Sequence, residues 1–391
     1  MVALLLYIYS FIIPLFDRPT SGDSRDYYLM YIISLAVLGV ISAIYRFSTS
    51  KVAINKFFVL CAIIIGFGFV GALAYGENIL YFRYSFSMVF LYAIMLLVYN
   101  HLSYEQVTRM FLFYGAGLLV GAILGGMGEW GMRLSGDIVS AGNVGIMPPI
   151  IIAICLNKIL QSGPNVYKGA LLGLGSFLIY LSAFTQSRIN FVLLCLVGLY
   201  FFIVCRNRFR RYRTVFSVFF IIILATVGIY YYQTFQYRFQ DPISTQQISM
   251  DVLTNPDAVD YSILTRVGFV LAGVNIFIDN PLGVGFGNFT DFLAEYNTLT
   301  NITIAHPHNT YIEILVSTGI GGTLCALFLV WYLFQRLKGD SFMQLILVLL
   351  LVAGLSSTLI YDKMLFLLFA SRDVLASNSM EKSGAKETVK A

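Results

Sequence analysis

Charge is the scarcest property of this sequence. Only 12% of its 391 residues are Asp, Glu, Lys or Arg, whereas 58% are hydrophobic. An ordinary soluble domain carries about 25% charged residues, so the composition excludes a protein that is solvated on all sides. The mean hydropathy of +0.80 indicates that most of the chain lies in lipid. We therefore predict an integral membrane protein.

Residues that bind metals or nucleic acids are also few. The chain has 3 His and 5 Cys, and the cysteines lie in or beside apolar runs without the spacing of metal ligands. We interpret them as packing residues and predict neither a metal site nor a disulfide framework. The net charge of +5 is spread over short loops, which argues against nucleic acid as a partner.

Long apolar runs are what the sequence has instead. A membrane-spanning helix needs about 20 mostly apolar residues, and the runs predict an all-α polytopic membrane protein of about 12 transmembrane helices. Nine runs come first, at 2–16, 28–45, 57–75, 80–98, 109–126, 143–158, 168–184, 189–205 and 214–232. Three more follow at 311–334, 342–356 and 358–371, where Asp362 and Lys363 make the last two boundaries the weakest.

The distribution of Lys and Arg predicts which side of the membrane each loop faces. Short cytoplasmic loops carry an excess of these residues. An N-terminus inside the cell puts the main basic groups on the cytoplasmic side, namely Lys51 and Lys56, Lys158 and Lys168, the arginines between 206 and 213, and Arg336 and Lys338. Both termini are then cytoplasmic.

This topology divides the chain into four parts. Residues 1–232 hold transmembrane helices 1–9, residues 306–372 hold helices 10–12, and residues 373–391 form a cytoplasmic tail that we expect to be disordered. Residues 233–305 form one long loop on the periplasmic side, which is the only segment large enough for a small extramembrane region.

Within the long loop, Tyr261–Ile278 is apolar enough to resemble another span. Arg266 lies in its first third, and an arginine inside a span costs about 2.5–3.5 kcal/mol on insertion scales. A crossing here would also move Arg336 to the outer side. We therefore predict an amphipathic helix at the outer interface, ended by Asn280 and Pro281.

Two of the three histidines lie together in Ala305-His306-Pro307-His308-Asn309, at the outer end of an apolar helix. An unperturbed imidazole has a pKa of about 6.5, so its neutral ring can accept a proton at physiological pH. An interfacial histidine that bonds a helix start is the alternative. The nearby arginines favour the general base for His308, whereas His101 keeps a structural interpretation.

Three arginines on the outer side stand out, because basic residues are disfavoured there. A guanidinium is always charged and binds phosphate in a bidentate manner. Arg188 lies in Phe-Thr-Gln-Ser-Arg at the junction of two helices, where contact with lipid headgroups is the alternative. Arg266 could instead form an ion pair with Asp257 or Asp260. Arg133 is the third, in Met-Arg-Leu-Ser-Gly-Asp.

A glycine-rich run, Asn-Pro-Leu-Gly-Val-Gly-Phe-Gly-Asn-Phe, covers residues 280–289. It is no dinucleotide-binding fingerprint, because no strand precedes it and no suitable helix follows it. We predict a tight turn that lets backbones approach closely.

In this order, the motifs around Arg188 and Arg266, the glycine-rich run and HPHNTYIEILVSTGIGG resemble the O-antigen ligase and O-antigen polymerase superfamily of integral membrane glycosyltransferases. The resemblance extends from about Leu181 to Leu333. It implies a GT-C-like fold in a bacterial inner membrane with a periplasmic active site. The donor would be a glycan linked to undecaprenyl diphosphate, and the enzyme would need no metal or other cofactor.

The resemblance also implies roles for individual residues. His308 would be the general base for the acceptor hydroxyl, Arg188 and Arg266 would hold the donor diphosphate, and Asn309 would orient the loop. His306 and Arg133 would support them. The ligase takes a lipid A core sugar as acceptor, whereas a polymerase takes another lipid-linked repeat.

Loop lengths favour the ligase over the polymerase. Polymerases often have two long outer loops, and here residues 127–142 are short while only 233–305 are long. A transporter of lipid-linked sugars and a non-enzymatic scaffold are further alternatives. Transporters keep ionisable residues near the bilayer midplane, whereas these candidates share one side.

Overall fold

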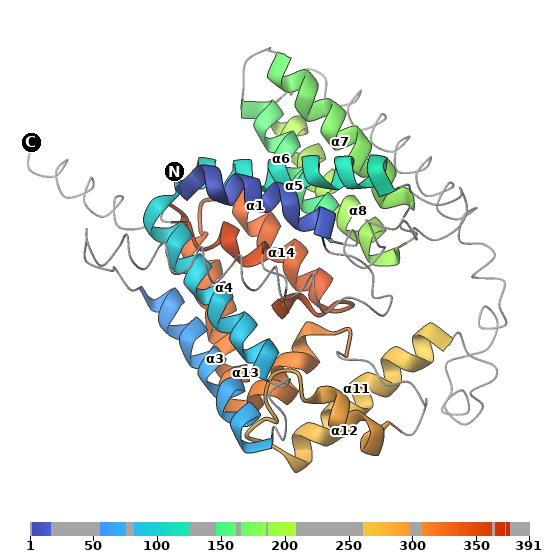
Figure 1. Cartoon of the computed structure of the whole chain (residues 1–391). Helices are drawn as coiled ribbons and strands as arrows, with labels where there is room; N and C mark the ends of the chain where they lie inside the picture. Colours follow the sequence, from blue (N-terminus) through green and yellow to red (C-terminus); the bar gives the residue numbers. More distant parts are fainter. Residues whose placement is uncertain are drawn as a thin grey trace, which may run out of the picture. The chain divides into compact units, whose positions relative to one another are not determined.

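The computed structural model is helical over the residues that it describes, and strands are absent from them (Figure 1). The described residues are 2–16, 55–75, 82–125, 146–161, 166–184, 187–208, 261–297, 307–361, 364–371 and 373–375. The helices are α1 (Val2–Phe16), α3 (Lys56–Tyr75), α4 (Phe82–His101), α5 (Tyr104–Gly125), α6 (Met147–Gln161), α7 (Val166–Phe184), α8 (Arg188–Arg208), α11 (Tyr261–Asp279), α12 (Phe289–Tyr296), α13 (Thr310–Arg336), α14 (Ser341–Gly354) and the 3-10 helices η4 (Leu359–Tyr361) and η5 (Leu365–Leu368).

Five of these helices are long and apolar enough to cross a membrane. They are α3, α4, α5, α8 and α13, and the apolar helices α6, α7 and α14 are shorter. The class of a polytopic helical membrane protein is therefore confirmed. The total of about 12 spans and the single long periplasmic loop stay predictions, because 28–45 and 214–232 lie outside the described residues.

The last apolar run differs from its prediction. The sequence predicts a spanning helix over 358–371, but the described residues there form η4 and η5. Met364, Leu365, Leu367 and Leu368 are all at most 1% exposed. The hydrophobicity of this run therefore serves packing against protein, which requires no continuous helix.

The chain divides into two compact units. The first comprises Met1–Ser24, Thr108–Thr245 and Leu345–Ala353, and the second comprises Arg25–Val107, Gln246–Gln344 and Gly354–Ala391. In the first unit, α6 packs on α7 and α8. Tyr7 of α1 stacks on Phe113 of α5 with ring centroids 5.1 Å apart. This unit includes Arg188, and the second includes Arg266 and His308.

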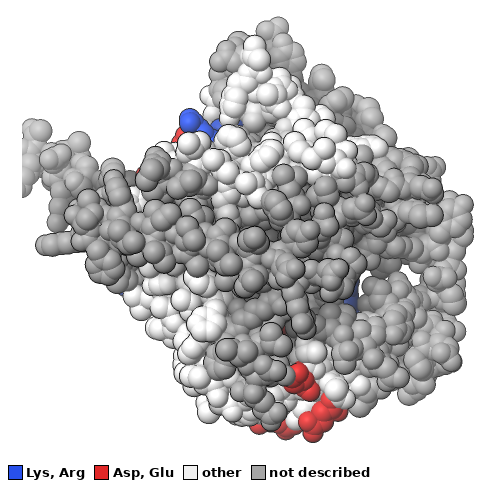
Figure 2. All heavy atoms as spheres, viewed as in Figure 1, with Lys and Arg blue, Asp and Glu red and all other residues white. Residues whose placement is uncertain are grey.

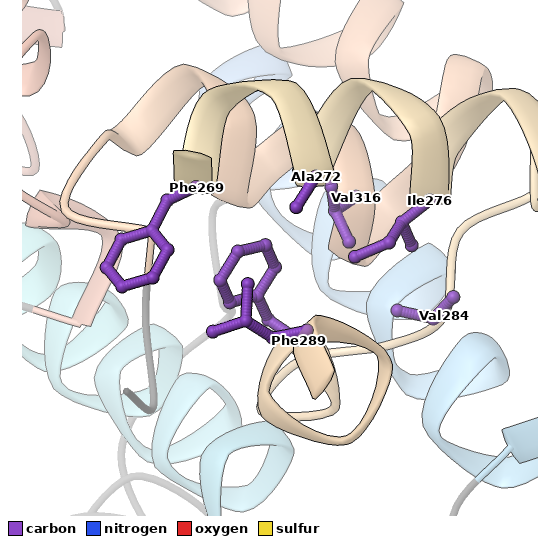
Figure 3. Packing of buried hydrophobic residues seen from close by; sticks show 7 residues of the cluster. Phe269, Ala272, Ile276, Val284, Phe289 and Val316 are labelled. Atoms are coloured by element: carbon purple, nitrogen blue, oxygen red, sulfur yellow. The ribbon is translucent and has the colours of Figure 1, made fainter. Parts of the chain in front are cut away.

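In the second unit, α3 lies against both α13 and α4 (Figure 1). The side of α11 that carries Phe269, Ala272 and Ile276 is fully buried against Phe289 of α12 and Val316 of α13. Figure 3 shows these side chains pointing toward one another from the three helices. Burial of one apolar stripe explains why the sequence Tyr261–Asp279 forms a helix here, and it confirms the helix predicted at these residues.

Helix α13 is broken at Gly319, whose φ of 63° and ψ of −164° are not helical. A regular helix would pair the Ile320 N–H with the Val316 carbonyl. Instead, Ile320 donates to the Pro281 carbonyl at 3.0 Å, and the Val316 carbonyl accepts from Val284 at 2.9 Å. The glycine-rich loop therefore satisfies the backbone groups that the break leaves open.

The same loop lies against the end of α3. A Cβ atom on Gly71 would stand 2.5 Å from the backbone nitrogen of Gly285, and one on Gly68 would overlap the ring of Phe286. Gly283, Gly285 and Gly287 have φ values of 86–92°. The prediction of a tight turn with close backbone approach is confirmed, since these conformations and contacts both require glycine.

Helix α11 runs parallel to the first segment of α13, residues 310–318. Phe269 lies against His308, Gly273 against Ile312, and the Pro281 carbonyl against the Ile320 N–H. In all three pairs the two residue numbers differ by the same amount. The two segments therefore keep one register from His308 to the break at Gly319.

Candidate active site at the start of α13

His308 lies immediately before the N-cap of α13. Its side chain is exposed, and its ring lies 6.5 Å from the ring of Phe269 at an angle of 33°. Its φ of 50° makes it the non-glycine residue with positive φ among those described. That conformation costs about 1–2 kcal/mol for an L residue, and such strain concentrates at functional sites.

Asn309 forms the N-cap of α13. Its Oδ1 accepts hydrogen bonds from the backbone N–H groups of Tyr311 at 2.9 Å and Ile312 at 3.1 Å. Its Nδ2 donates to the Leu355 carbonyl at 3.2 Å. An Asn cap of this kind stabilises a helix by about 1 kcal/mol. The residue therefore both starts α13 and attaches it to the end of α14.

Arg266 is exposed on α11. It precedes Phe269 by three residues, which corresponds to about 4.5 Å along a helix. It also precedes Gly273 by seven residues, so the two share one side of α11, and Gly273 faces Ile312 of α13. The structure therefore brings Arg266 to the same end of the α11 and α13 pair as His308.

The structure does not place the other predicted site residues beside His308. Arg188 is the first residue of α8 in the first unit, and its role together with His308 stays a prediction. Arg133 and His306 lie outside the described residues. The structure thus places two of the predicted residues, His308 and Arg266, at the same end of the α11 and α13 pair, and Asn309 follows His308 in the chain.

Glu313 is a residue that sequence reasoning missed. It lies in the first turn of α13 and is fully buried. Its Oε1 accepts a hydrogen bond from Ser317 Oγ at 3.1 Å. An acidic residue inside a candidate span is costly and commonly functional, and that signal was available in HNTYIEIL.

A tyrosine on α12 forms a hydrogen bond with the last residue of α11. The Tyr296 hydroxyl donates to Asp279 Oδ2 at 2.8 Å. This hydrogen bond to the carboxylate raises the pKa of Tyr296 to about 12. Asp279 and Tyr296 lie at the end of α11 opposite Arg266. The bond therefore joins α11 to α12 and takes no part in the candidate site.

The second unit has opposite charges at its two ends. Helices α3 and α13 are antiparallel, because Gly71 lies against the loop bound to Ser317, whereas Phe67 lies against Gly321. The basic end therefore joins the start of α3 to the end of α13, and includes Lys56, Arg336 and Lys338. The exposed residues Asp279, Asp291 and Glu295 gather at the other end, on α11 and α12 (Figure 2).

Within the described parts of the chain, no three His, Cys, Asp or Glu side chains are close enough to hold a metal ion. The cysteines described there are all free thiols.

These features define a helical membrane protein with an exposed histidine and arginine at one end of a helix pair. Residues 173–327 match the family model described as O-antigen ligase. The match confirms the resemblance of this part of the chain to the O-antigen ligase and O-antigen polymerase superfamily. It includes Arg188, Arg266, His308 and the glycine-rich loop. None of the curated proteins compared with the chain matches it.

Proposed function

We propose that this protein is an O-antigen ligase of the bacterial inner membrane. It transfers a glycan from undecaprenyl diphosphate to a sugar hydroxyl of the lipid A core at the periplasmic face. The observation that carries this proposal is the position of His308 and Arg266 at one exposed end of the α11 and α13 pair. The family match to O-antigen ligase supports the chemistry.

The proposed reaction is a single displacement at the anomeric carbon. His308 accepts the proton of the acceptor hydroxyl, whose oxygen forms the new bond to that carbon. The bond from the carbon to the diphosphate oxygen breaks, and the electron pair leaves with the diphosphate. Attack from the opposite side inverts the anomeric centre.

Charge stabilisation is assigned to arginine. The leaving diphosphate gains negative charge as its bond to the sugar breaks, and guanidinium groups already in place stabilise that charge. We assign this role to Arg266 and Arg188, with Arg133 and His306 as supporting residues. The reaction then needs no metal ion, and a chelator should leave its rate unchanged.

The charge distribution supports an orientation for the second unit. Cytoplasmic ends of membrane helices carry the excess of Lys and Arg. The end of the second unit with Lys56, Arg336 and Lys338 would then be cytoplasmic. Glu295 and the rest of the acidic end would then face the periplasm.

A polymerase of O-antigen or exopolysaccharide is the main alternative, because it uses the same donor chemistry. Purified protein incubated with lipid-linked glycan distinguishes the two when each acceptor is offered separately. Transfer to lipid A core supports the ligase, and transfer only to a lipid-linked repeat supports the polymerase. Movement of the donor across vesicles without a new glycosidic bond would support the transporter and contradict both enzymes.

A further inference from the structure

Thr310, the first residue of α13, has a hydroxyl that bridges two backbone groups from a distant segment. Its Oγ1 donates to the Ser357 carbonyl at 2.6 Å and accepts from the Leu359 N–H at 2.8 Å. The side chain is only 9% exposed. One hydroxyl therefore uses both its donor and an acceptor lone pair on residues that follow α14.

The groups that Thr310 binds lie in the connection between α14 and η4 and at the first residue of η4. Helix α14 ends at Gly354, and η4 begins at Leu359. The first N–H of a helix has no partner within that helix, and carbonyls of a connecting segment also need partners when they are buried. Thr310 supplies partners for Ser357 and Leu359, and Asn309 supplies one for Leu355. We call residues 355–359 the anchor segment.

The approach of the two segments is close. A Cβ atom on Gly354 would stand 3.3 Å from the Cβ of Thr310 and 3.5 Å from a ring carbon of Tyr311. The start of α13 therefore packs directly on the end of α14. A small lateral shift of the anchor segment would move Asn309 and Thr310 with it.

His308 is the next residue toward the N-terminus from these two anchored residues. Its left-handed backbone conformation is unfavourable in isolation, so neighbouring contacts must hold it. On one side, the Phe269 ring lies beside its imidazole. On the other, three hydrogen bonds between the anchor segment and the side chains of Asn309 and Thr310 fix the chain that follows His308.

We propose that the anchor segment acts through Thr310 to hold the imidazole of His308 in position. Thr310 is a positioning residue, because its bonds go to backbone groups and it acts through His308. The expected effect of Thr310 on catalysis rests on the proposed role of His308 as general base. The structural part of the inference concerns the orientation of His308 and can be measured without turnover.

Thr310→Val tests the proposal, because valine keeps the shape of threonine and removes the hydroxyl. Thr310→Ser restores the hydroxyl. Thr323→Val is the matched control on the same helix, since the Thr323 hydroxyl bonds only the Gly319 carbonyl one turn earlier, at 2.7 Å, among the hydrogen bonds of the described residues. Asn309→Asp is a second test of the anchor segment, because aspartate keeps the cap oxygen and removes the Nδ2 donor to the Leu355 carbonyl.

The first readout is the rate at which diethyl pyrocarbonate modifies His308, followed by tandem mass spectrometry across pH. We expect Thr310→Val and Asn309→Asp to change this rate severalfold, while Thr310→Ser and Thr323→Val keep the wild-type rate. The second readout is kinetic. A displaced catalytic group lowers kcat by about tenfold to a hundredfold, with the KM for the lipid-linked donor unchanged and recovery in Thr310→Ser.

Unchanged labelling and unchanged kcat in folded Thr310→Val would overturn the inference. If Thr310→Val does not fold, unchanged labelling in Asn309→Asp would overturn it in the same way. Altered labelling in a protein that shows no glycan transfer even as wild type would instead contradict the proposed function and leave the positioning intact. Full transfer by a His308 variant would contradict only the role of His308 as base.

Discussion

His308 combines a reactive side chain with a backbone conformation that few residue types accept. Asn, Asp and His are enriched among non-glycine residues with positive φ, so the φ of 50° itself restricts what can replace this histidine. A substitution to alanine would change the backbone preference and the chemistry together. A replacement that tolerates the left-handed region separates the two effects.

His308→Asn should therefore lower glycan transfer by about a hundredfold or more, the usual contribution of a general base. The ring is exposed, and asparagine tolerates the conformation, so thermal unfolding in detergent should stay near the wild-type temperature. Normal production of capped lipopolysaccharide by this variant in cells would show that another group accepts the proton.

The arginines can be tested by substitutions that keep the charge. Lysine offers a point charge and lacks the planar pair of donors that matches a diphosphate. Arg266→Lys and Arg188→Lys should each lower kcat by about a hundredfold if they stabilise the leaving group. Steady-state kinetics with purified protein measure this. Full activity of Arg188→Lys would favour contact with lipid headgroups instead.

At the scale of elements, the break in α13 and the glycine-rich loop form one unit. Each provides the backbone partners that the other lacks, as the bonds between Pro281 and Ile320 and between Val284 and Val316 illustrate. Gly319 has a conformation open only to glycine. Its Cβ position would also stand 2.5 Å from the Pro281 carbonyl oxygen.

Gly319→Ala should therefore lower the free energy of unfolding by about 1–3 kcal/mol and reduce glycan transfer, because His308 immediately precedes the first segment of α13. Gly66→Ala on α3 is the control, since a Cβ atom there meets nothing within 4 Å. Thermal unfolding of both purified variants measures the difference. Equal stability of the two would contradict the role assigned to the break.

The bond between α11 and α12 predicts a dependence on pH. The pKa of Tyr296 is raised to about 12, so the stability that its bond to Asp279 contributes is fully present below the ordinary pKa of about 10. It is lost as pH rises through the folded value. Tyr296→Phe should remove this part of the alkaline destabilisation, which unfolding curves between these two pH values would detect.

Particular residues illustrate how much of the fold and of the candidate site could be predicted from the sequence. The helix at Tyr261–Asp279 and the tight glycine turn followed from local patterns. The break at Gly319 did not, because a single glycine in an apolar helix is ordinarily helical and its partner loop lies far away in sequence. The position of Arg266 and His308 at the same end of the α11 and α13 pair depends on tertiary packing, so the sequence suggested it only through the family resemblance.

At the scale of the whole molecule, the separation of charge predicts orientation. Glu295 lies at the acidic end of the second unit, and Lys338 at the basic end. Glu295→Cys should react with a membrane-impermeant maleimide added to intact spheroplasts. Lys338→Cys should react only after the membrane is permeabilised, and the unsubstituted protein provides the background of native thiols. The reverse pattern would contradict the proposed topology.

The common register of α11 and α13 also determines where related chains can differ in length. One residue inserted between Phe269 and Pro281 would rotate Arg266 by about 100° and advance it by about 1.5 Å, while the Pro281 bond to Ile320 holds the other end. Insertions after Tyr296 would leave these pairs intact. Length variation among relatives that keep the reaction should therefore gather between α12 and α13 and avoid α11.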